Sequence, residues 1–283
     1  MAINTIGVVG AGTMGNGIAQ AFAVAGHVVT MTDIAQAQVD RGVKTIDGSL
    51  ERLVKKEKMS AGDKAAVLAR IKTSTDLAAL KDSDLLVEAA TENLELKLKI
   101  FAQLDALARP DAILASNTSS ISLTRIAAAT KRPDKVIGMH FFNPVPVLQL
   151  VEVIRAVQTS DQTASAIVQL ARDLGKEPAE ARDFPGFVSN RILMPFVNEA
   201  AYALMEGVAE AEAIDTIAKL GFAHPMGPLA LADLIGLDTC VAIMEVLHEG
   251  LGDPKYAPCP LLREHVEAGR LGRKSGRGFY DYG

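Results

Sequence analysis

Two ionisable residues stand in an otherwise apolar stretch near the middle of the chain. His140 begins the segment HFFNPVP, and Glu152 is the single acid in the apolar run of residues 147–154. A histidine that closes one strand and a carboxylate on the next strand can meet across a sheet. Such a pair forms a general base near neutral pH, because the carboxylate orients the imidazole and stabilises its protonated form. Taken alone, each residue is more often part of a core, so the surrounding elements must decide.

A glycine-rich turn near the N-terminus predicts a dinucleotide site. Residues 3–9 form a short apolar strand, the loop GAGTMG follows, and a helical pattern then runs to Gly26. In a GxGxxG loop the first glycine permits the tight turn, the second lets the backbone approach a pyrophosphate, and the third allows close packing of the helix. The residues expected to bind the cofactor are Gly10, Gly12, Thr13, Met14 and Gly15.

An acid follows the second predicted strand, residues 27–32. Asp33 lies 18 residues after Gly15, about where an acid binds the ribose hydroxyls of adenosine in this arrangement. A carboxylate there repels a 2′-phosphate, and the first arginine of the chain is Arg41. The sequence therefore predicts NAD, rather than NADP, as the cofactor.

Polar residues also follow the predicted strands at residues 84–90 and 112–115. Glu92 comes after the first strand, and Asn117 and Ser119 come after the second. Since ligands bind at the carboxyl ends of strands in open α/β sheets, these side chains are candidates for contact with cofactor or substrate. Each also has a structural alternative, because acids favour the first turn of a helix, and amides and hydroxyls cap helix N-termini.

The order of elements predicts an α/β fold with two domains. Strands and helices, including a long helix over residues 35–59, alternate as far as a strand near residues 176–181, which indicates a Rossmann-type, doubly wound, mostly parallel sheet. The segment DFPG at residues 183–186 interrupts this pattern, so we predict domains at 1–184 and 185–283. The second domain is expected to be all-α, with helices at residues 187–205, 209–220, 229–249 and 260–268.

The helices of the second domain carry much apolar surface, which predicts a homodimer through this domain. Asn190 is a polar exception in the first turns of the first helix, and alone it is as compatible with a solvent-facing position as with a site.

Composition narrows the classes of partner. The chain has 283 residues, 49% of them hydrophobic, and a formal net charge of −5, so it lacks the global basic field that binding to nucleic acid or a membrane surface requires. No apolar run approaches the length of a membrane span, and no basic leader precedes the first strand. The two cysteines are too few for a disulfide framework. We therefore expect a cytoplasmic protein without a metal site.

The motifs together resemble the L-3-hydroxyacyl-CoA dehydrogenase family, in particular its short monofunctional members, the 3-hydroxybutyryl-CoA dehydrogenases. The glycine loop is shared by many families, whereas HFFNPVP followed by PGFVSNR is highly specific. The resemblance covers nearly the whole chain and rests on residues 10–15, 88–97 (EAATENLELK), 116–120 (SNTSS), 140–146, 150–153 (LVEV), 185–191, 225–228 (PMGP), 236–238 and 276–280 (GRGFY).

This resemblance implies an NAD-dependent oxidoreductase that interconverts 3-hydroxyacyl-CoA and 3-ketoacyl-CoA. It implies that His140 is the catalytic acid/base and that Glu152 pairs with it. Substrate oxygen or thioester contacts are implied for Ser119 and Asn190, whose placement on separate domains would let closure assemble the site.

The resemblance also implies ligand-binding residues outside the catalytic group. It places Asp33 at the adenosine ribose, and Glu92, Lys97 and Asn117 at the nicotinamide side. Predicted contacts to the acyl-CoA substrate fall on Ser49, Lys56 and Asn143. Lys56 belongs to a lysine group near the end of the helix over residues 35–59, which is equally typical of a solvated helix face.

Two other functions stay open. A dehydrogenase of a free hydroxy acid or sugar acid uses the same fold, and charge reversal at Lys56 distinguishes it by the affinity for acetoacetyl-CoA. A catalytically idle NAD-binding protein of the crystallin type has no need of His140, Glu152, Ser119 and Asn190 together. A module of a larger hydratase-dehydrogenase is not expected, because the sequence begins at the first strand and ends at Gly283.

Overall fold

The computed structural model describes residues 3–283, which form two compact units. The first unit ends at Asp183 and the second covers Phe184–Gly283. Within the described residues, none of the helices has both the length and the apolar character that crossing a membrane requires.

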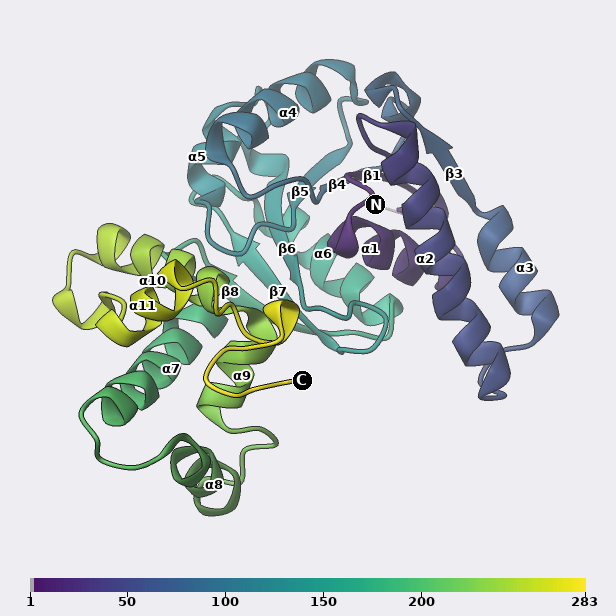
Figure 1. Cartoon of the computed structure of the whole chain (residues 1–283). Helices are drawn as coiled ribbons and strands as arrows, with labels where there is room; N and C mark the ends of the chain where they lie inside the picture. The colour runs from purple at the N-terminus through teal and green to yellow at the C-terminus, as the bar shows by residue number, and fades with distance from the viewer. Residues whose placement is uncertain (1–2) are drawn as a thin grey trace. The chain divides into compact units, whose positions relative to one another are not determined.

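A single sheet of eight strands forms the centre of the first unit (Figure 1), in the order β3-β2-β1-β4-β5-β6-β7-β8. Among these strands every neighbouring pair is parallel except β6 and β7. The predicted α/β fold class, a Rossmann-type sheet followed by a helical domain, is confirmed. The strands are β1 (Thr5–Val9), β2 (Val28–Thr32), β3 (Ile71–Ser74), β4 (Leu85–Glu88), β5 (Ile113–Ser116), β6 (Val136–Phe141), β7 (Leu150–Arg155) and β8 (Glu177–Arg182).

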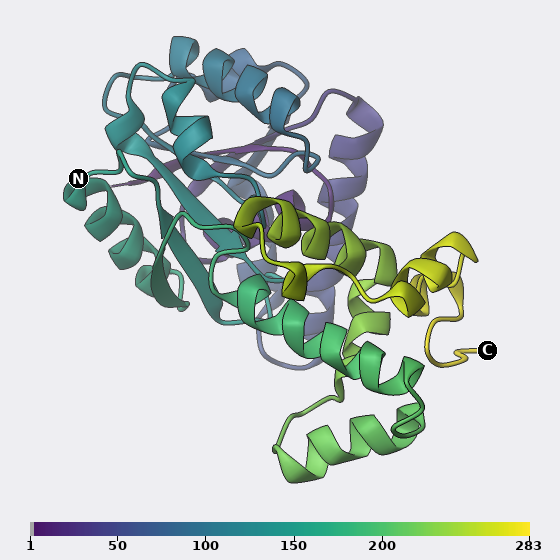
Figure 2. The ribbon, with the colours of Figure 1, turned by 90° about the vertical axis from the view of Figure 1, so that its left-hand side faces the viewer.

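Helices cover both faces of this sheet (Figures 1 and 2). Ile18 and Phe22 of α1 and Ile167 of α6 belong to one buried cluster with Ile6 and Val8 of β1. This burial of alternate strand residues under helices is what a doubly wound sheet requires. The helices of the unit are α1 (Thr13–Val24), α2 (Gln36–Lys55), α3 (Ala61–Ala69), α4 (Leu94–Leu107), α5 (Leu123–Ala128), α6 (Asp161–Asp173) and the short 3₁₀ helices η1 (Leu77–Leu80) and η2 (Pro133–Lys135).

The second unit is helical, as the sequence predicts. Its core contains Met194 and Val197 of α7, and Leu237 and Met244 of α10. The elements are α7 (Ser189–Met205), α8 (Ala211–Gly221), α9 (Pro228–Ile235), α10 (Leu237–Leu251), α11 (Pro260–Glu267), η3 (Pro254–Tyr256) and η4 (Arg273–Ser275).

Two buried aspartates fix the chain's C-terminal segment. Asp233, 1% exposed, accepts hydrogen bonds from the amides of Phe279 and Tyr280 and from the hydroxyl of Tyr282. Asp215 accepts the Tyr280 hydroxyl at 2.9 Å. The aromatic residues of GRGFY therefore serve the architecture of the second unit, since buried carboxylates require such partners.

One predicted element is wrong, and two others, the helix α3 and the strand β3, were not predicted. The single helix expected over residues 229–249 is two helices, because Gly236 between α9 and α10 takes a φ of 104°, which interrupts helical geometry. The edge strand β3 is short, and its two central residues are exposed, so it lacks the apolar signature of a strand. The long helix predicted over residues 35–59 ends at Lys55.

Candidate active site

The centre of the site is the pair that the antiparallel strands bring together. His140 of β6 lies directly opposite Glu152 of β7 in the register. Their side chains meet with Nδ1 of His140 2.7 Å from Oε2 of Glu152, and the two residues are 7% and 3% exposed. A carboxylate at Nδ1 favours the tautomer with the proton on that nitrogen, which leaves Nε2 as the nitrogen able to accept a proton.

Asn117 connects the end of β6 to the middle of the sheet. Its side-chain oxygen accepts a hydrogen bond from the backbone amide of Phe141 at 2.9 Å. Its backbone amide donates to the carbonyl of Glu88 at 2.8 Å. The ring of Phe142 lies 4.6 Å from that of His140, between centroids. Asn117 thus holds the histidine's strand within the protein, and its predicted contact with the cofactor stays a prediction.

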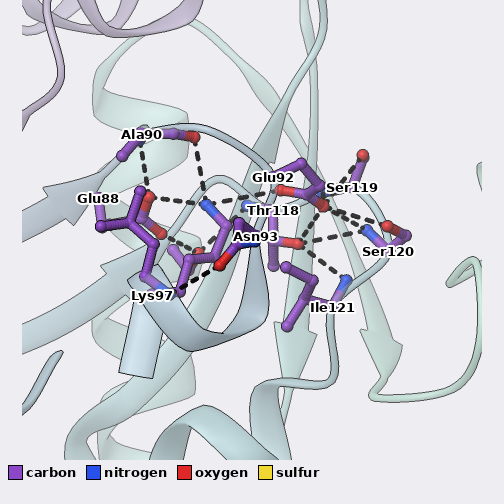
Figure 3. A network of polar contacts seen from close by, with 11 residues as sticks. Glu88, Ala90, Glu92, Asn93, Lys97, Thr118, Ser119, Ser120 and Ile121 are labelled. Carbon is purple, nitrogen blue, oxygen red and sulfur yellow. Dashed lines mark hydrogen bonds and ion pairs between the residues drawn. The ribbon is translucent and has the colours of Figure 1, made fainter. Parts of the chain in front are cut away.

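Glu92 organises the segment that carries Ser119 (Figure 3). Its Oε1 accepts hydrogen bonds from the amides of Ser119 at 3.0 Å and Ser120 at 3.1 Å, and from the Thr118 hydroxyl at 2.5 Å. The alternative of a first-turn acid is wrong, because α4 begins after Glu92 and its N-cap is Asn93. The carboxylate reaches across to the next strand's loop instead.

The local charges and hydrogen bonds set the ionisation of Glu92. Partial burial alone would raise its pKa. The ammonium of Lys97, together with hydrogen bonds from Thr118, Ser119 and Ser120, outweighs that effect, and the net result is a lowered pKa. Glu92 is therefore an anion at neutral pH.

Lys97 is buried in an ion pair that the sequence analysis missed. It is 1% exposed, and its Nζ lies 2.7 Å from Oε1 of Glu88, 3.3 Å from the carbonyl of Ala90 and 3.5 Å from Oε2 of Glu92. Glu88 was read only as part of a buried strand. An acid inside an apolar run was the available signal, the same one that singled out Glu152.

The glycine loop has the geometry that a bound pyrophosphate needs. Gly10 takes a φ of 101°, and a Cβ on Gly15 would lie 1.8 Å from the Gly10 carbonyl oxygen. A Cβ on Gly12 would meet nothing within 4 Å, so the space above this residue is open to a ligand. Thr13 and Met14 follow as the first residues of α1, whose N-terminus favours an anion.

Asp33 stands beside the glycine loop, directly after β2. Its Oδ2 accepts the amide of Ala11 at 2.8 Å, while the amide of Gly10 donates to the carbonyl of Thr32. These two bonds fix the loop to the end of β2. The structure thus places the acid proposed for ribose recognition next to the turn proposed for the phosphates.

A cavity of about 260 Å³ lies between the loop, α1, α2 and residues 143–146. Two predicted substrate residues, Ser49 and Asn143, line it together with Gly12. Arg41 and Arg52 also line this cavity, although the sequence did not indicate them as ligands. Lys56 does not line it. A larger cavity of about 820 Å³ among Asn4, His27, Asp134 and their neighbours contains none of the predicted site residues.

The fourth catalytic candidate belongs to the second unit. Asn190 lies in the first turn of α7 and is 8% exposed. Its backbone amide donates to the carbonyl of Gly186 at 3.2 Å. Gly186 in turn has a φ of 73°. The break in the sequence pattern therefore leads directly into the turn that presents Asn190.

Comparison with known proteins now identifies the family. Residues 5–184 match the model of the 3-hydroxyacyl-CoA dehydrogenase NAD binding domain, and residues 186–282 match that of the C-terminal domain. The chain belongs to the 3-hydroxyacyl-CoA dehydrogenase family. The resemblance predicted from the motifs and the choice of NAD as cofactor are both confirmed, and the open glycine loop fits this cofactor.

Individual relatives in this family match along the full length. A probable 3-hydroxybutyryl-CoA dehydrogenase of Deinococcus radiodurans is 59% identical over 276 residues, which are 98% of this chain and 99% of the relative. The crystal structure of (S)-3-hydroxybutyryl-CoA dehydrogenase from Ralstonia eutropha superposes with a TM-score of 0.97, at 58% identity and with 100% of both chains covered. Human mitochondrial hydroxyacyl-coenzyme A dehydrogenase is 44% identical, with 99% of this chain and 91% of the relative covered.

Two alanine substitutions in the glycine loop should have opposite signatures. Gly12→Ala should fold normally but weaken NADH binding by about tenfold or more, because its methyl group enters the space of the pyrophosphate. Gly15→Ala should lower stability by roughly 3 kcal/mol, because its methyl group overlaps the Gly10 carbonyl. Thermal unfolding without cofactor and titration with NADH separate the two effects. Unchanged NADH affinity in Gly12→Ala would contradict the assignment of the loop.

Glu92 should contribute stability that depends on pH. A carboxyl group whose pKa is lower in the folded state stabilises the fold above its unfolded pKa, and this contribution is lost as the pH falls through the folded value. Glu92→Gln should therefore be less stable than the wild type at neutral pH, and this difference should shrink at pH values below 4.5, the ordinary pKa of the group. Melting temperatures of both proteins across this range test it, and a constant difference would exclude a charge effect.

Proposed function

We propose that this protein is an NAD-dependent 3-hydroxyacyl-CoA dehydrogenase that acts on short chains and interconverts 3-hydroxybutyryl-CoA and acetoacetyl-CoA. The observation that carries the proposal is the buried His140–Glu152 pair, which lies at the same edge of the sheet as the glycine loop. Full-length similarity to 3-hydroxybutyryl-CoA dehydrogenases supports the choice of substrate.

Oxidation of the substrate requires that a proton leave the hydroxyl group while a hydride leaves the same carbon. When bound, NAD supplies the acceptor for the hydride. His140 takes the proton at Nε2, and Glu152 stabilises the imidazolium by accepting the hydrogen bond from Nδ1. In the reverse direction, negative charge develops on the ketone oxygen as the hydride arrives, and the imidazolium donates its proton to this oxygen.

Ser119 and Asn190 are the proposed donors to the reacting oxygen. Ser119 is suited to this task because Glu92 fixes its amide, so the hydroxyl starts from a defined backbone position. Asn190 is nearly buried at the start of α7. A donor aimed at the oxygen where charge develops lowers the barrier of the chemical step without strengthening cofactor binding.

The α2 side of the cavity beside the glycine loop is the proposed contact region for the phosphates of coenzyme A, and the space above Gly12 is left to the cofactor. Arg41 and Arg52 supply local positive charge there, in a protein whose net charge is −5, and Ser49 adds a hydroxyl. Arginine binds phosphate oxygens through several donors at once. The structure favours Arg52 over Lys56 for this role, because only the arginine lines the cavity.

A homodimer is proposed from the exposed apolar side chains of the second unit. Ile192, Val208, Leu220 and Phe222 of the second unit are all more than half exposed. Large apolar side chains in this number favour an interface, which supports a homodimer through the helical domain. The domain boundary predicted after residue 184 and a cytoplasmic location also stay predictions.

Variants of the catalytic residues should lower turnover far more than cofactor binding. His140→Ala should nearly abolish turnover, Glu152→Gln should reduce kcat by about 100- to 10,000-fold, and Ser119→Ala by about 100-fold. Asn190→Ala should behave like the serine variant. Stopped-flow turnover and NADH titration provide the two readouts, and near-native turnover of the His140 variant would overturn the assignment.

The choice of substrate is tested by oxidation of NADH with different acceptors. Acetoacetyl-CoA should be reduced rapidly, longer 3-ketoacyl-CoAs more slowly, and free acetoacetate barely. NADPH should replace NADH poorly because of Asp33. Efficient use of free acetoacetate would favour a hydroxy acid dehydrogenase, a possibility that a diketoreductase of 33% identity and the same fold makes worth testing.

A matched pair of variants locates the coenzyme A anchor. Arg52→Glu should raise the KM for acetoacetyl-CoA about tenfold, and Lys56→Glu should change it less, because Lys56 lies outside the cavity lining. The KM for NADH, measured in both variants, shows whether a substitution also disturbs the cofactor site, because Gly12 and Arg52 line the same cavity. A larger effect at Lys56 would return the anchor to the residue that the sequence predicted.

A further inference from the structure

Glu88 is a charged residue at a position that the fold would normally give to an apolar one. It ends β4, after the fully buried residues Leu85, Leu86 and Val87, and is itself 0% exposed. Taking a carboxylate out of water costs several kcal/mol, and a well-packed apolar residue in its place is often equally stable or more so. The stability of the core therefore does not account for this glutamate.

Both oxygens of Glu88 are fully engaged by three different parts of the chain. Oε1 accepts the ammonium of Lys97 at 2.7 Å and the amide of Ala90 at 2.7 Å, and Oε2 accepts the hydroxyl of Ser116 at 2.6 Å. The carboxylate thus joins the loop after β4, the first turns of α4 and the end of β5. These are the segments that lead to Glu92 and to Ser119.

We propose that Glu88 is a positioning residue, which holds Lys97 in place so that Glu92 keeps the segment of Ser119 in its reactive position. The inference rests on the proposed function of Ser119. The path is continuous, because Lys97 touches both carboxylates and Oε1 of Glu92 accepts the Ser119 amide at 3.0 Å (Figure 3). Glu88 itself acts only through these neighbours.

The division of Lys97 between two carboxylates explains why Glu88 is needed. Its Nζ is 2.7 Å from Glu88 but 3.5 Å from Glu92, so the ammonium is bound mainly to the buried partner. Without the charge of Glu88, the buried ammonium has only Glu92 as a charged partner among the contacts described here. Glu92 would then turn toward Lys97 and release the amides of Ser119 and Ser120, because a buried charge must be compensated.

The segment that carries His140 is connected to Glu88 through the main chain of Glu88, not through its side chain. The Glu88 carbonyl accepts the amide of Asn117, whose side chain holds Phe141, the neighbour of His140. A substitution of the Glu88 side chain leaves this carbonyl in place. The side-chain effect should therefore reach Ser119 and spare the His140–Glu152 pair.

Two variants test the proposal in the full chain. Glu88→Gln keeps the shape of the side chain and removes its charge. Glu88→Leu combined with Lys97→Met removes both charges and leaves an apolar pair, which should preserve folding even if the single variant does not fold. In Glu88→Gln, kcat with acetoacetyl-CoA should fall about 10- to 100-fold, the range expected for misplacement of a catalytic group, while the KM for NADH changes less than threefold. In the apolar pair kcat should fall as well, because Glu92 loses the ammonium at 3.5 Å that helps to orient it.

Coupling with the catalytic residues gives a readout that mere destabilisation does not move. Adding Ser119→Ala to Glu88→Gln should lower kcat little further, whereas adding Glu152→Gln should lower it by its full single-variant factor. Asp215→Asn is the control, because Asp215 is a buried, fully bonded carboxylate of the second unit and should affect melting temperature without affecting kcat.

The results separate the inference from the proposed function. Rapid reduction of acetoacetyl-CoA by the wild type tests the function, and the ratio of variant to wild-type kcat tests Glu88. Wild-type kcat in a folded Glu88→Gln or apolar-pair variant would overturn the proposal. Full multiplication of the effects of Glu88→Gln and Ser119→Ala would overturn it as well.

Discussion

The antiparallel pairing of β6 with β7 is the constraint on which the proposed chemistry depends. The six neighbouring strands β3, β2, β1, β4, β5 and β6 run in one direction. Their carboxyl ends therefore bring the glycine loop, Glu92, Asn117 and His140 to one edge of the sheet. The reversal of β7 then places a residue from the middle of a strand directly opposite the histidine. A slip of one residue would turn Glu152 to the other face and bring a valine to this position. Burial of both Val151 and Val153 opposes such a slip.

The first unit contains two strand carboxylates that water cannot reach, and it compensates each from a different element. Glu152 is paired with a ring from the neighbouring strand, and Glu88 with an ammonium from α4. Neither pair is a favourable way to fill a core, because burial of a carboxylate has a desolvation cost that its partner offsets only in part. Their value is geometric, since a buried pair with short hydrogen bonds allows only one arrangement of the segments it joins.

The sequence was sufficient for the fold and for much of the site. Strand-loop-helix order and the glycine spacing predict the nucleotide-binding architecture, and an acid in an apolar run predicts Glu152. The same pattern holds at Glu88, but periodicity does not reveal which cation reaches a buried carboxylate. Lys97 comes nine residues later, on a helix, and only packing brings the two together. The structure gives Lys97 three contacts within the protein, and the contact of Lys97 with the cofactor stays a prediction.

Other differences have equally local causes. The split at Gly236 depends on one backbone angle, and a helical pattern of apolar residues continues through it. Arg52 lines the cavity and Lys56 does not, which the sequence does not reveal, because a count of charges does not show which face of α2 borders a cavity. To identify such residues, one must know how the helix is oriented about its own axis. Sequence patterns fix that orientation only through the apolar face.

The loop of Ser119 limits the ways in which charge on the substrate oxygen can be stabilised. The amides of Ser119 and Ser120 donate to Glu92, and that of Ile121 donates to the Thr118 hydroxyl. Main-chain donors of this segment are therefore engaged inside the protein, unlike those of an oxyanion hole. The Ser119 hydroxyl lies 3.3 Å from Glu92, and a hydroxyl group can change partners at little cost when a ligand binds. The proposed donors, this hydroxyl and the side chain of Asn190, are a modest substitute for fixed main-chain amides, so in the proposed mechanism the proton of His140 removes most of the negative charge. The proposed mechanism therefore depends most on the alignment of His140 by Glu152.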